Sequence, residues 1–193
     1  MHQRSFYFVN GLQHITRALT FDKNIDLLFC SETWATENDF KILESIKPPG
    51  YYFASFPRKD RRGGGIGILL RSSYIPNVKQ MHVLDNHSFE AAELILQFGN
   101  RNISFICVYK PPKSERYKFS NNNFFKEFSC LVDSSSSNNK EVIFVGDYNV
   151  HYDNLSDSLT KKISTFLSER HLCQLVTAQL MKQVIHWTGS SHL

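Results

Sequence analysis

Four residues, Gly146-Asp147-Tyr148-Asn149, directly follow the apolar run Val142-Ile143-Phe144-Val145. The run is too short and too β-branched for a helix, so it predicts a buried strand. Glycine, aspartate and asparagine favour turns, so the strand should end there and leave Asp147 and Asn149 at the rim of a sheet. Ligands of α/β proteins commonly bind at the carboxyl ends of strands. A carboxylate and an amide at this rim are therefore candidates for a site, although a lone tetrapeptide of this kind is equally typical of an ordinary polar turn.

Two further apolar runs end in groups that could join this site. Residues 26–30 are followed by Glu32, and residues 103–108 are followed by Tyr109. Two carboxylates, an amide and a phenol suit one hard divalent cation and one phosphate, because Mg²⁺ prefers oxygen ligands and is usually held by one or two carboxylates plus substrate phosphate. We therefore expect these two groups to converge with the Asp147 rim in one cleft.

The order and spacing of these motifs resemble the endonuclease/exonuclease/phosphatase family, and within it the endonuclease domain of non-long-terminal-repeat retrotransposons. The matching segments are residues 26–34, which end in Glu-Thr-Trp, residues 62–68 with three glycines, residues 107–114 with Tyr-Lys-Pro-Pro, and residues 145–151 with Gly-Asp-Tyr-Asn. Each motif is weak alone, whereas collinear motifs over roughly residues 12–177 are specific.

The resemblance implies a metal-dependent phosphodiesterase that acts on DNA, with Mg²⁺ or Mn²⁺ as cofactor. It implies that Glu32 is a metal ligand, that Tyr109 contacts the scissile phosphate, that Asp147 orients or deprotonates the attacking water, and that Asn149 holds the phosphate or the developing charge. These roles fit the chemistry, since phosphodiester cleavage needs a positioned water, a Lewis acid and charge stabilisation on the phosphoryl oxygens.

Basic residues flank two of the motifs. The candidates for contacts with the DNA backbone are Arg61, Arg62, Lys110 and Lys113. Basic loops beside a phosphate site would supply the salt-dependent attraction that dominates nucleic-acid affinity. The net charge is only +4, so solvated loops that keep the chain soluble are the alternative.

The remaining pattern predicts a single α/β domain over residues 1–177. Expected helices cover residues 12–19, 38–46, 121–132 and 158–170; expected strands cover residues 25–30, 51–56, 66–70, 78–84, 92–98, 103–109, 142–145 and 172–176. Strands interspersed with helices in this order indicate two packed sheets with helices outside, a four-layer α/β sandwich. The resemblance implies the same deoxyribonuclease I-like architecture.

The sequence also departs from the family pattern. An asparagine is expected on the leading strand, and Asn10 is interpreted as too close to the following helix to supply it. A later Leu-Asp motif and an Asp-His pair are absent before Leu193. A reading frame that begins one base earlier near Ala178 could encode Pro-Thr-His-Glu-Ala-Gly-His-Thr-Leu-Asp-Trp, which matches the family. We interpret residues 178–193 as an out-of-frame, irregular tail on a domain that lacks its last strands, with weak metal binding and impaired catalysis.

Composition limits the other possibilities. No run approaches the roughly 20 apolar residues of a membrane span, and the four cysteines have no paired spacing, which favours reduced thiols and an intracellular protein of the nucleus or cytoplasm. Two alternatives to the endonuclease stay open: a phosphatase of the same superfamily, and a non-catalytic module that binds nucleic acid or protein through the same cleft. The sequence leaves the oligomeric state open.

Overall fold

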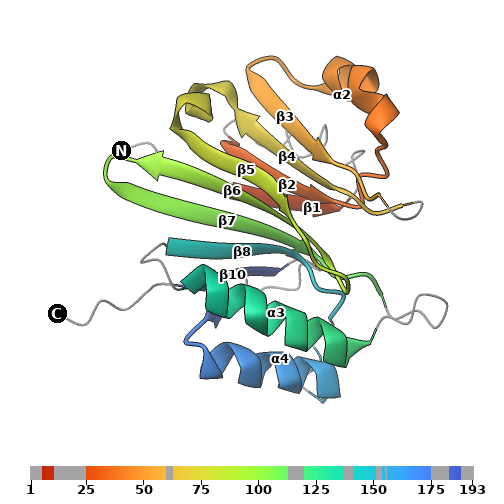
Figure 1. Ribbon diagram of the computed structural model, residues 1–193, viewed down its shortest axis with the longest axis vertical. Helices are drawn as coiled ribbons and strands as arrows, with labels where there is room; N and C mark the ends of the chain where they lie inside the picture. Colours follow the sequence, from red (N-terminus) through yellow and green to blue (C-terminus); the bar gives the residue numbers. More distant parts are fainter. Residues whose placement is uncertain are drawn as a thin grey trace.

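Two β-sheets pack face to face in the computed structural model, which describes residues 6–10, 25–59, 63–112, 120–136, 141–150, 154, 156–174 and 183–187 (Figure 1). The first sheet has the strand order β1-β2-β4-β3. Its strands are β1 (Phe6–Asn10), β2 (Leu27–Ser31), β4 (Ile66–Arg71) and β3 (Tyr51–Phe56). Strands β1 and β2 are parallel, and the other two pairings are antiparallel, so the sheet is mixed.

The second sheet has the order β5-β6-β7-β8-β10-β9. Its strands are β5 (Val78–Leu84), β6 (Glu90–Phe98), β7 (Arg101–Tyr109), β8 (Glu141–Asp147), β10 (Gln183–Trp187) and β9 (Cys173–Gln174). Strands β6 and β7 form the expected hairpin, with Gly99 at φ +61° in its turn. Strands β7 and β8 are parallel, and this pairing is the one that positions the candidate site.

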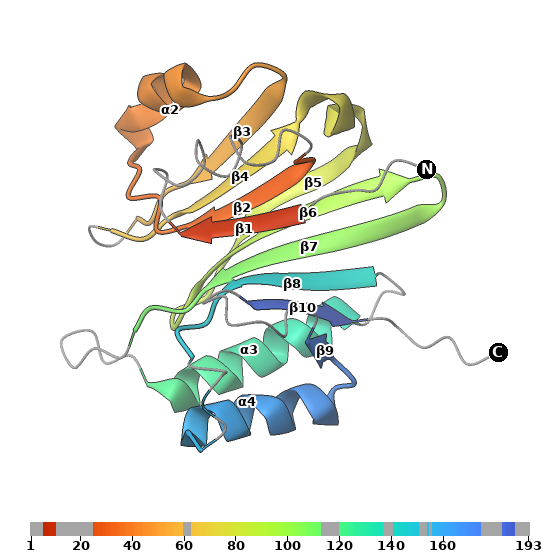
Figure 2. The ribbon, with the colours of Figure 1, turned by 180° about the vertical axis from the view of Figure 1, so that it is seen from behind.

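Helices lie outside the paired sheets. The helix α3 (Asn121–Ser136) and the helix α4 (Ser158–Glu169) run along the outer face of the second sheet (Figure 2). The short helix α2 (Phe40–Ile46) follows the 3-10 turn η1 (Glu37–Asp39), and a second 3-10 turn, η2 (Ser72–Asn77), links β4 to β5. The predicted α/β fold class of two packed mixed sheets with helices is confirmed. The helix expected at residues 12–19 lies outside the described residues.

Each interface between these layers has its own apolar core. Between the two sheets, buried side chains such as Phe29 and Phe105 contact each other, with ring centroids 6.0 Å apart. Between the second sheet and its helices, Phe128 packs on Phe144 of β8 and on Phe166 of α4, with centroids 5.5 and 5.4 Å apart. Aromatic pairs add to the stability that burial alone supplies.

Most of the predicted elements are confirmed with small changes at their ends. The helix α3 continues beyond the predicted end at residue 132 into a serine-rich stretch and ends at Ser136. The hydroxyls of Ser134 and Ser135 donate to the carbonyl of Leu131, and bonds of this kind let serine remain in a helix.

The prediction of an irregular tail is wrong for residues 183–187. These residues form β10, which pairs antiparallel with β8 on one side and with β9 on the other. The free edge of β8 explains the difference, because an unpaired edge offers a row of backbone donors and acceptors that an extended segment can satisfy whatever its side chains are. The second sheet therefore does not end at β8, and the boundary at residue 178 stays a prediction.

Candidate functional site

The predicted site residues come from the carboxyl ends of three strands. Tyr109 is the last residue of β7 and stands in register with Asp147, the last residue of β8. Glu32 directly follows β2 in the facing sheet. Because parallel strands end at the same edge, β7 and β8 bring the phenol and the carboxylate side by side.

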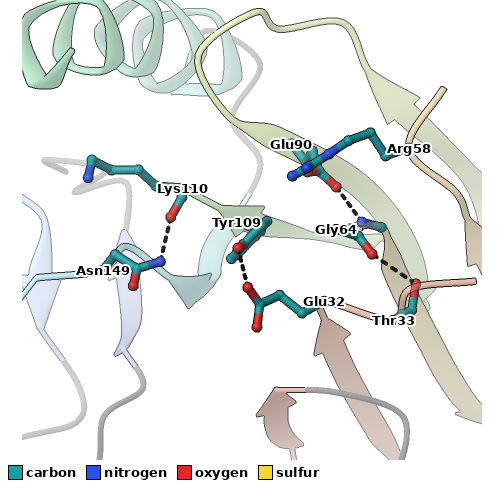
Figure 3. A network of polar contacts seen from close by, with 9 residues as sticks. Glu32, Thr33, Arg58, Gly64, Glu90, Tyr109, Lys110 and Asn149 are labelled. Carbon is teal, nitrogen blue, oxygen red and sulfur yellow. Dashed lines mark hydrogen bonds and ion pairs between the residues drawn. The ribbon is translucent and has the colours of Figure 1, made fainter. Parts of the chain in front are cut away.

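A hydrogen bond joins the two sheets at this edge. The hydroxyl of Tyr109 donates to Oε1 of Glu32 (Figure 3). Tyr109 is buried, and its burial together with this bond to a carboxylate raises the pKa of the phenol well above its ordinary value. The phenol therefore stays protonated at neutral pH, where it can donate a hydrogen bond but cannot act as a base.

Asp147 and Asn149 are fixed by bonds within their own turn and to β7. Oδ1 of Asp147 accepts from the backbone N–H of Asn149 at 2.9 Å, which is the local bond that makes aspartate a turn former. The Asn149 side chain donates to the carbonyl of Lys110 at 2.7 Å, and the Lys110 N–H donates to the carbonyl of Asp147 at 2.9 Å. The turn that follows β8 is therefore hydrogen-bonded to the residue after β7.

Backbone strain gathers at the same edge. Four described residues other than glycine have a positive φ, and three of them are Glu32 (+51°), Trp34 (+55°) and Asn149 (+47°). Such conformations are uncommon for residues with a Cβ, and asparagine tolerates them better than tryptophan or glutamate does. Strain of this kind persists only where the surrounding contacts fix it, and it is concentrated at functional sites.

The contacts of Glu90 with Gly65 and Arg58, together called the brace, link the two sheets and help to hold this strained backbone in place. Oε2 of Glu90 accepts from the backbone N–H of Gly65 at 2.6 Å, and Oε1 of Glu90 forms an ion pair with Arg58. The guanidinium of Arg58 in turn lies over the ring of Tyr109, with Cζ 5.9 Å from the ring centroid. Glu90 also stands directly opposite Tyr109 across β6 and β7.

The glycine turn at residues 63–65 also accepts hydrogen bonds from the loop that carries Glu32, so the brace holds this loop as well. The carbonyl of Gly65 accepts from the Thr33 N–H at 3.3 Å, and the carbonyl of Gly64 accepts from the Trp34 N–H at 2.8 Å. Residues 63–65 lead directly into the predicted strand at residues 66–70, since β4 begins at Ile66. Sequence reasoning missed Arg58 and Glu90, because their partners are distant in the chain.

The basic residues predicted to contact DNA are placed only in part. Lys110 is 5% exposed, its ammonium lies 5.7 Å from the centre of the Phe124 ring, and burial lowers its pKa. This differs from the open loop position that the sequence suggested, because the side chain folds back onto α3. The other three, Arg61, Arg62 and Lys113, lie outside the described residues.

Asn10 lies on the leading strand, to which no asparagine was assigned from the sequence, whereas the helix expected after it lies outside the described residues. Asn10 is the last residue of β1, in register with Ser31, the residue just before Glu32. Its backbone therefore stands at the same edge as the site, where an asparagine of the leading strand was expected. The signal was present in the sequence, since Asn10 follows the apolar run of residues 6–9 just as Asp147 follows its own.

The donors at this edge fit a weakly held hard cation. Glu32 and Asp147 both border Tyr109, and two carboxylates with room for phosphate and water are a common magnesium set. Within the described part of the chain, no three histidine, cysteine, aspartate or glutamate side chains gather closely enough to hold a metal on their own. Glu32 is the residue best placed to be a ligand.

None of the helices in the described ranges has the length and apolar character to span a membrane.

No family model and no curated protein matches the chain in sequence. Solved structures do match its fold. The D. rerio TDP2 complexed with single strand DNA product is 11% identical, with a TM-score of 0.60 over 94% of this chain and 78% of that one. AP endonuclease LMAP from Leishmania major is 12% identical, with a TM-score of 0.63 over 94% and 77%. The mannosyl-6-phosphatase Bt3783 of Bacteroides thetaiotaomicron is 12% identical, with a TM-score of 0.63 over 95% and 84%.

These neighbours include nucleases and phosphatases of the endonuclease/exonuclease/phosphatase fold, and the chain shares that fold. At identities this low, the likeness establishes the architecture and leaves the activity to be argued from the site.

Proposed function

We propose that the chain carries the site of a metal-dependent phosphodiesterase that acts on DNA. The observation that supports this most directly is the bond from Tyr109 to Glu32, which links the two sheets where β7 and β8 present Tyr109 beside Asp147. It supports a site in which the Glu32 carboxylate, the neutral phenol of Tyr109 and the Asp147 carboxylate act together.

Each group has a task in that reaction. Glu32 would hold Mg²⁺ or Mn²⁺, which when bound supplies charge stabilisation at the phosphate. When Glu32 holds the metal, the Tyr109 hydroxyl would turn its single proton from Glu32 to a phosphoryl oxygen, and Asp147 would accept a proton from the attacking water. Asn149 keeps its place through the carbonyl of Lys110 and adds a polar contact for the developing charge.

DNA is the substrate proposed over a phosphate monoester. The motif spacing resembles the endonucleases of retrotransposons, and among the structures that share the fold, TDP2 was crystallised with a single strand DNA product. We further propose that the chain derives from a retroelement and that its frame slipped near Ala178, which would leave catalysis well below that of an intact enzyme.

A second candidate function is a non-catalytic DNA-binding module. It would use the same edge of the two sheets, where Tyr109 and Glu32 are joined. Such a module would shift DNA in a salt-dependent manner but would not cut it.

Two measurements test the proposal. In calorimetry, Mg²⁺ should bind weakly, and Glu32→Gln should abolish the binding. The matched control is Glu37→Gln, an exposed carboxylate five residues along in η1, which should leave it unchanged. Mg²⁺ binding that survives Glu32→Gln would remove Glu32 from the metal site.

The second measurement is nicking of supercoiled plasmid. The chain should nick slowly or not at all with Mg²⁺ present, and restoring the earlier frame at Ala178 should raise the rate by orders of magnitude. Coding DNA that does not spell Pro-Thr-His-x-x-Gly-His-Thr-Leu-Asp in that frame would refute the frameshift. A restored chain that binds DNA but still does not nick would favour the binding module.

A further inference from the structure

Trp34 is the most exposed large apolar side chain in the described part of the protein, at 62% of its full accessible area. It follows Glu32 by two residues, so the two Cα atoms are at most about 7 Å apart. An indole left in water beside a proposed phosphate site needs an explanation, because tryptophan is normally well buried.

The backbone holds this side chain in a defined place. The Trp34 N–H donates to the carbonyl of Gly64 at 2.8 Å, and its φ of +55° is unusual for so bulky a residue. Thr33, between Trp34 and Glu32, is tied to Gly65, whose own N–H is bound by Glu90. The brace that fixes the Glu32 loop therefore also fixes the backbone from which the indole projects.

Gly63 supports one part of the ring and leaves the remainder open. A Cβ added at Gly63 would stand 3.5 to 3.7 Å from Cζ2, Cη2 and Cε2 of Trp34. One edge of the six-membered ring thus lies beside Gly63, at ordinary van der Waals distance from the place that a Cβ would take. A rigid, supported and still exposed aromatic surface is the kind of platform on which a nucleobase stacks.

We propose that Trp34 stacks on an unpaired nucleobase next to the phosphate bound at Glu32 and Tyr109, which makes single-stranded or locally opened DNA the preferred ligand. This rests on the proposed function in so far as the phosphate site places the strand. Stacking on an aromatic side chain contributes about 1–3 kcal/mol per base. Loss of the indole should therefore weaken binding by about 5- to 150-fold.

The test uses binding alone, in EDTA so that no strand is cut. The probes are a short oligothymidylate and an oligomer of the same length with abasic sugars in place of thymidines. The chain has two tryptophans, so a Trp187→Phe background makes the emission report on Trp34. The oligothymidylate should quench this emission and bind more tightly than the abasic oligomer.

Two variants remove the indole in different ways. Trp34→Ala removes the ring, and Trp34→Gly also removes it while favouring the positive φ, so that a folding defect in the first does not decide the result. Because these variants lack the reporter indole, their binding is followed by the fluorescence anisotropy of end-labelled oligomers, as is that of the parent. Both should lose the preference for thymidine over abasic sugar and retain the abasic affinity. The matched control is Tyr52→Ala, an aromatic on β3 that is 44% exposed and should change neither.

Several outcomes would overturn the proposal. Equal losses for both oligomers would show that Trp34 only holds the glycine turn, and no loss for either would show that no base reaches it. Tighter binding of a duplex than of the single strand would exclude an unpaired base. These results are separable from failure of the proposed function, which is measured by Mg²⁺ binding in Glu32→Gln.

Discussion

Gly146 sets the distance between the two strands that carry Tyr109 and Asp147. It stands opposite Val108 in the parallel pairing of β7 with β8, one residue before Asp147. Its φ of +148° lies in a region open to glycine almost alone. Replacement by alanine therefore tests whether close approach of β7 and β8 is what builds the site.

The expected cost follows from the geometry. A Cβ at Gly146 would stand 1.8 Å from the carbonyl oxygen of Val108. A carbon and a carbonyl oxygen normally stay about 3.3 Å apart, so the strands would have to separate by about 1.5 Å. Such a shift breaks roughly two or three ladder bonds of about 1 kcal/mol each. The backbone conformation adds about 1–2 kcal/mol, giving a loss of about 4 kcal/mol.

The assay is urea unfolding of Gly146→Ala followed by circular dichroism. The control is Gly99→Ala, which shares a positive φ of +61° but has nothing within 4 Å of the added Cβ. It should lose only about 1–2 kcal/mol. If Gly146→Ala fails to accumulate as folded protein while Gly99→Ala does, the ranking holds. Losses that agree within about 1 kcal/mol would refute the reasoning, because contact with β7 would then contribute nothing.

Other predictions concern the brace, a helix end and the buried phenol. Glu90→Ala should lower the free energy of unfolding by about 2–4 kcal/mol, since it removes the ion-pair partner of the part-buried Arg58 and the acceptor of the glycine turn. A double variant, Arg58→Ala with Glu90→Ala, that is no less stable than Glu90→Ala alone would support this, and additive losses would contradict it. Asp157→Ala should lower the free energy of unfolding in urea by about 1 kcal/mol, because the Asp157 side chain caps two N–H groups of α4. The control is Ser158→Ala, and a loss for Asp157→Ala no larger than that of the control would contradict the capping role. The raised pKa of Tyr109 means that the protonated phenol favours the fold fully below about pH 10 and progressively less as pH rises above it. The wild type should therefore lose stability relative to Tyr109→Phe between about pH 9 and 11, and a constant difference over that range would show that the phenol is not perturbed.

The strands that bear the site were predictable because their signals are local. Residues 142–145 and 103–108 are apolar runs that end at turn-forming residues, and the structure ends β8 and β7 there. The turn bond from Asn149 to Asp147 is equally local. Pairing of Tyr109 with Asp147 needed only that the two strands be parallel neighbours, which the spacing of an intervening helix favours.

The brace could not be predicted in the same way. Glu90 lies 25 residues from Gly65 and 32 from Arg58, and nothing in the sequence near Glu90 marks it as their partner. The burial of Lys110 had the same cause, since its neighbour Phe124 belongs to a helix whose approach depends on the whole core. Long-range contacts follow from topology, and local periodicity carries no information about them.

Strand β10 is a different kind of error, because it is a strand in a segment that was expected to be irregular. The out-of-frame interpretation of residues 178–193 predicted an irregular segment, yet Gln183–Trp187 pairs with β8 over five residues. Alternation of side chains is required only when one face of a strand must be buried and the other solvated. A segment that mainly satisfies the backbone of an open edge needs an extended conformation and no proline, and residues 183–187 meet both conditions. Strand formation at this edge therefore says little about whether the segment was selected to be there, and the coding DNA remains the discriminating measurement.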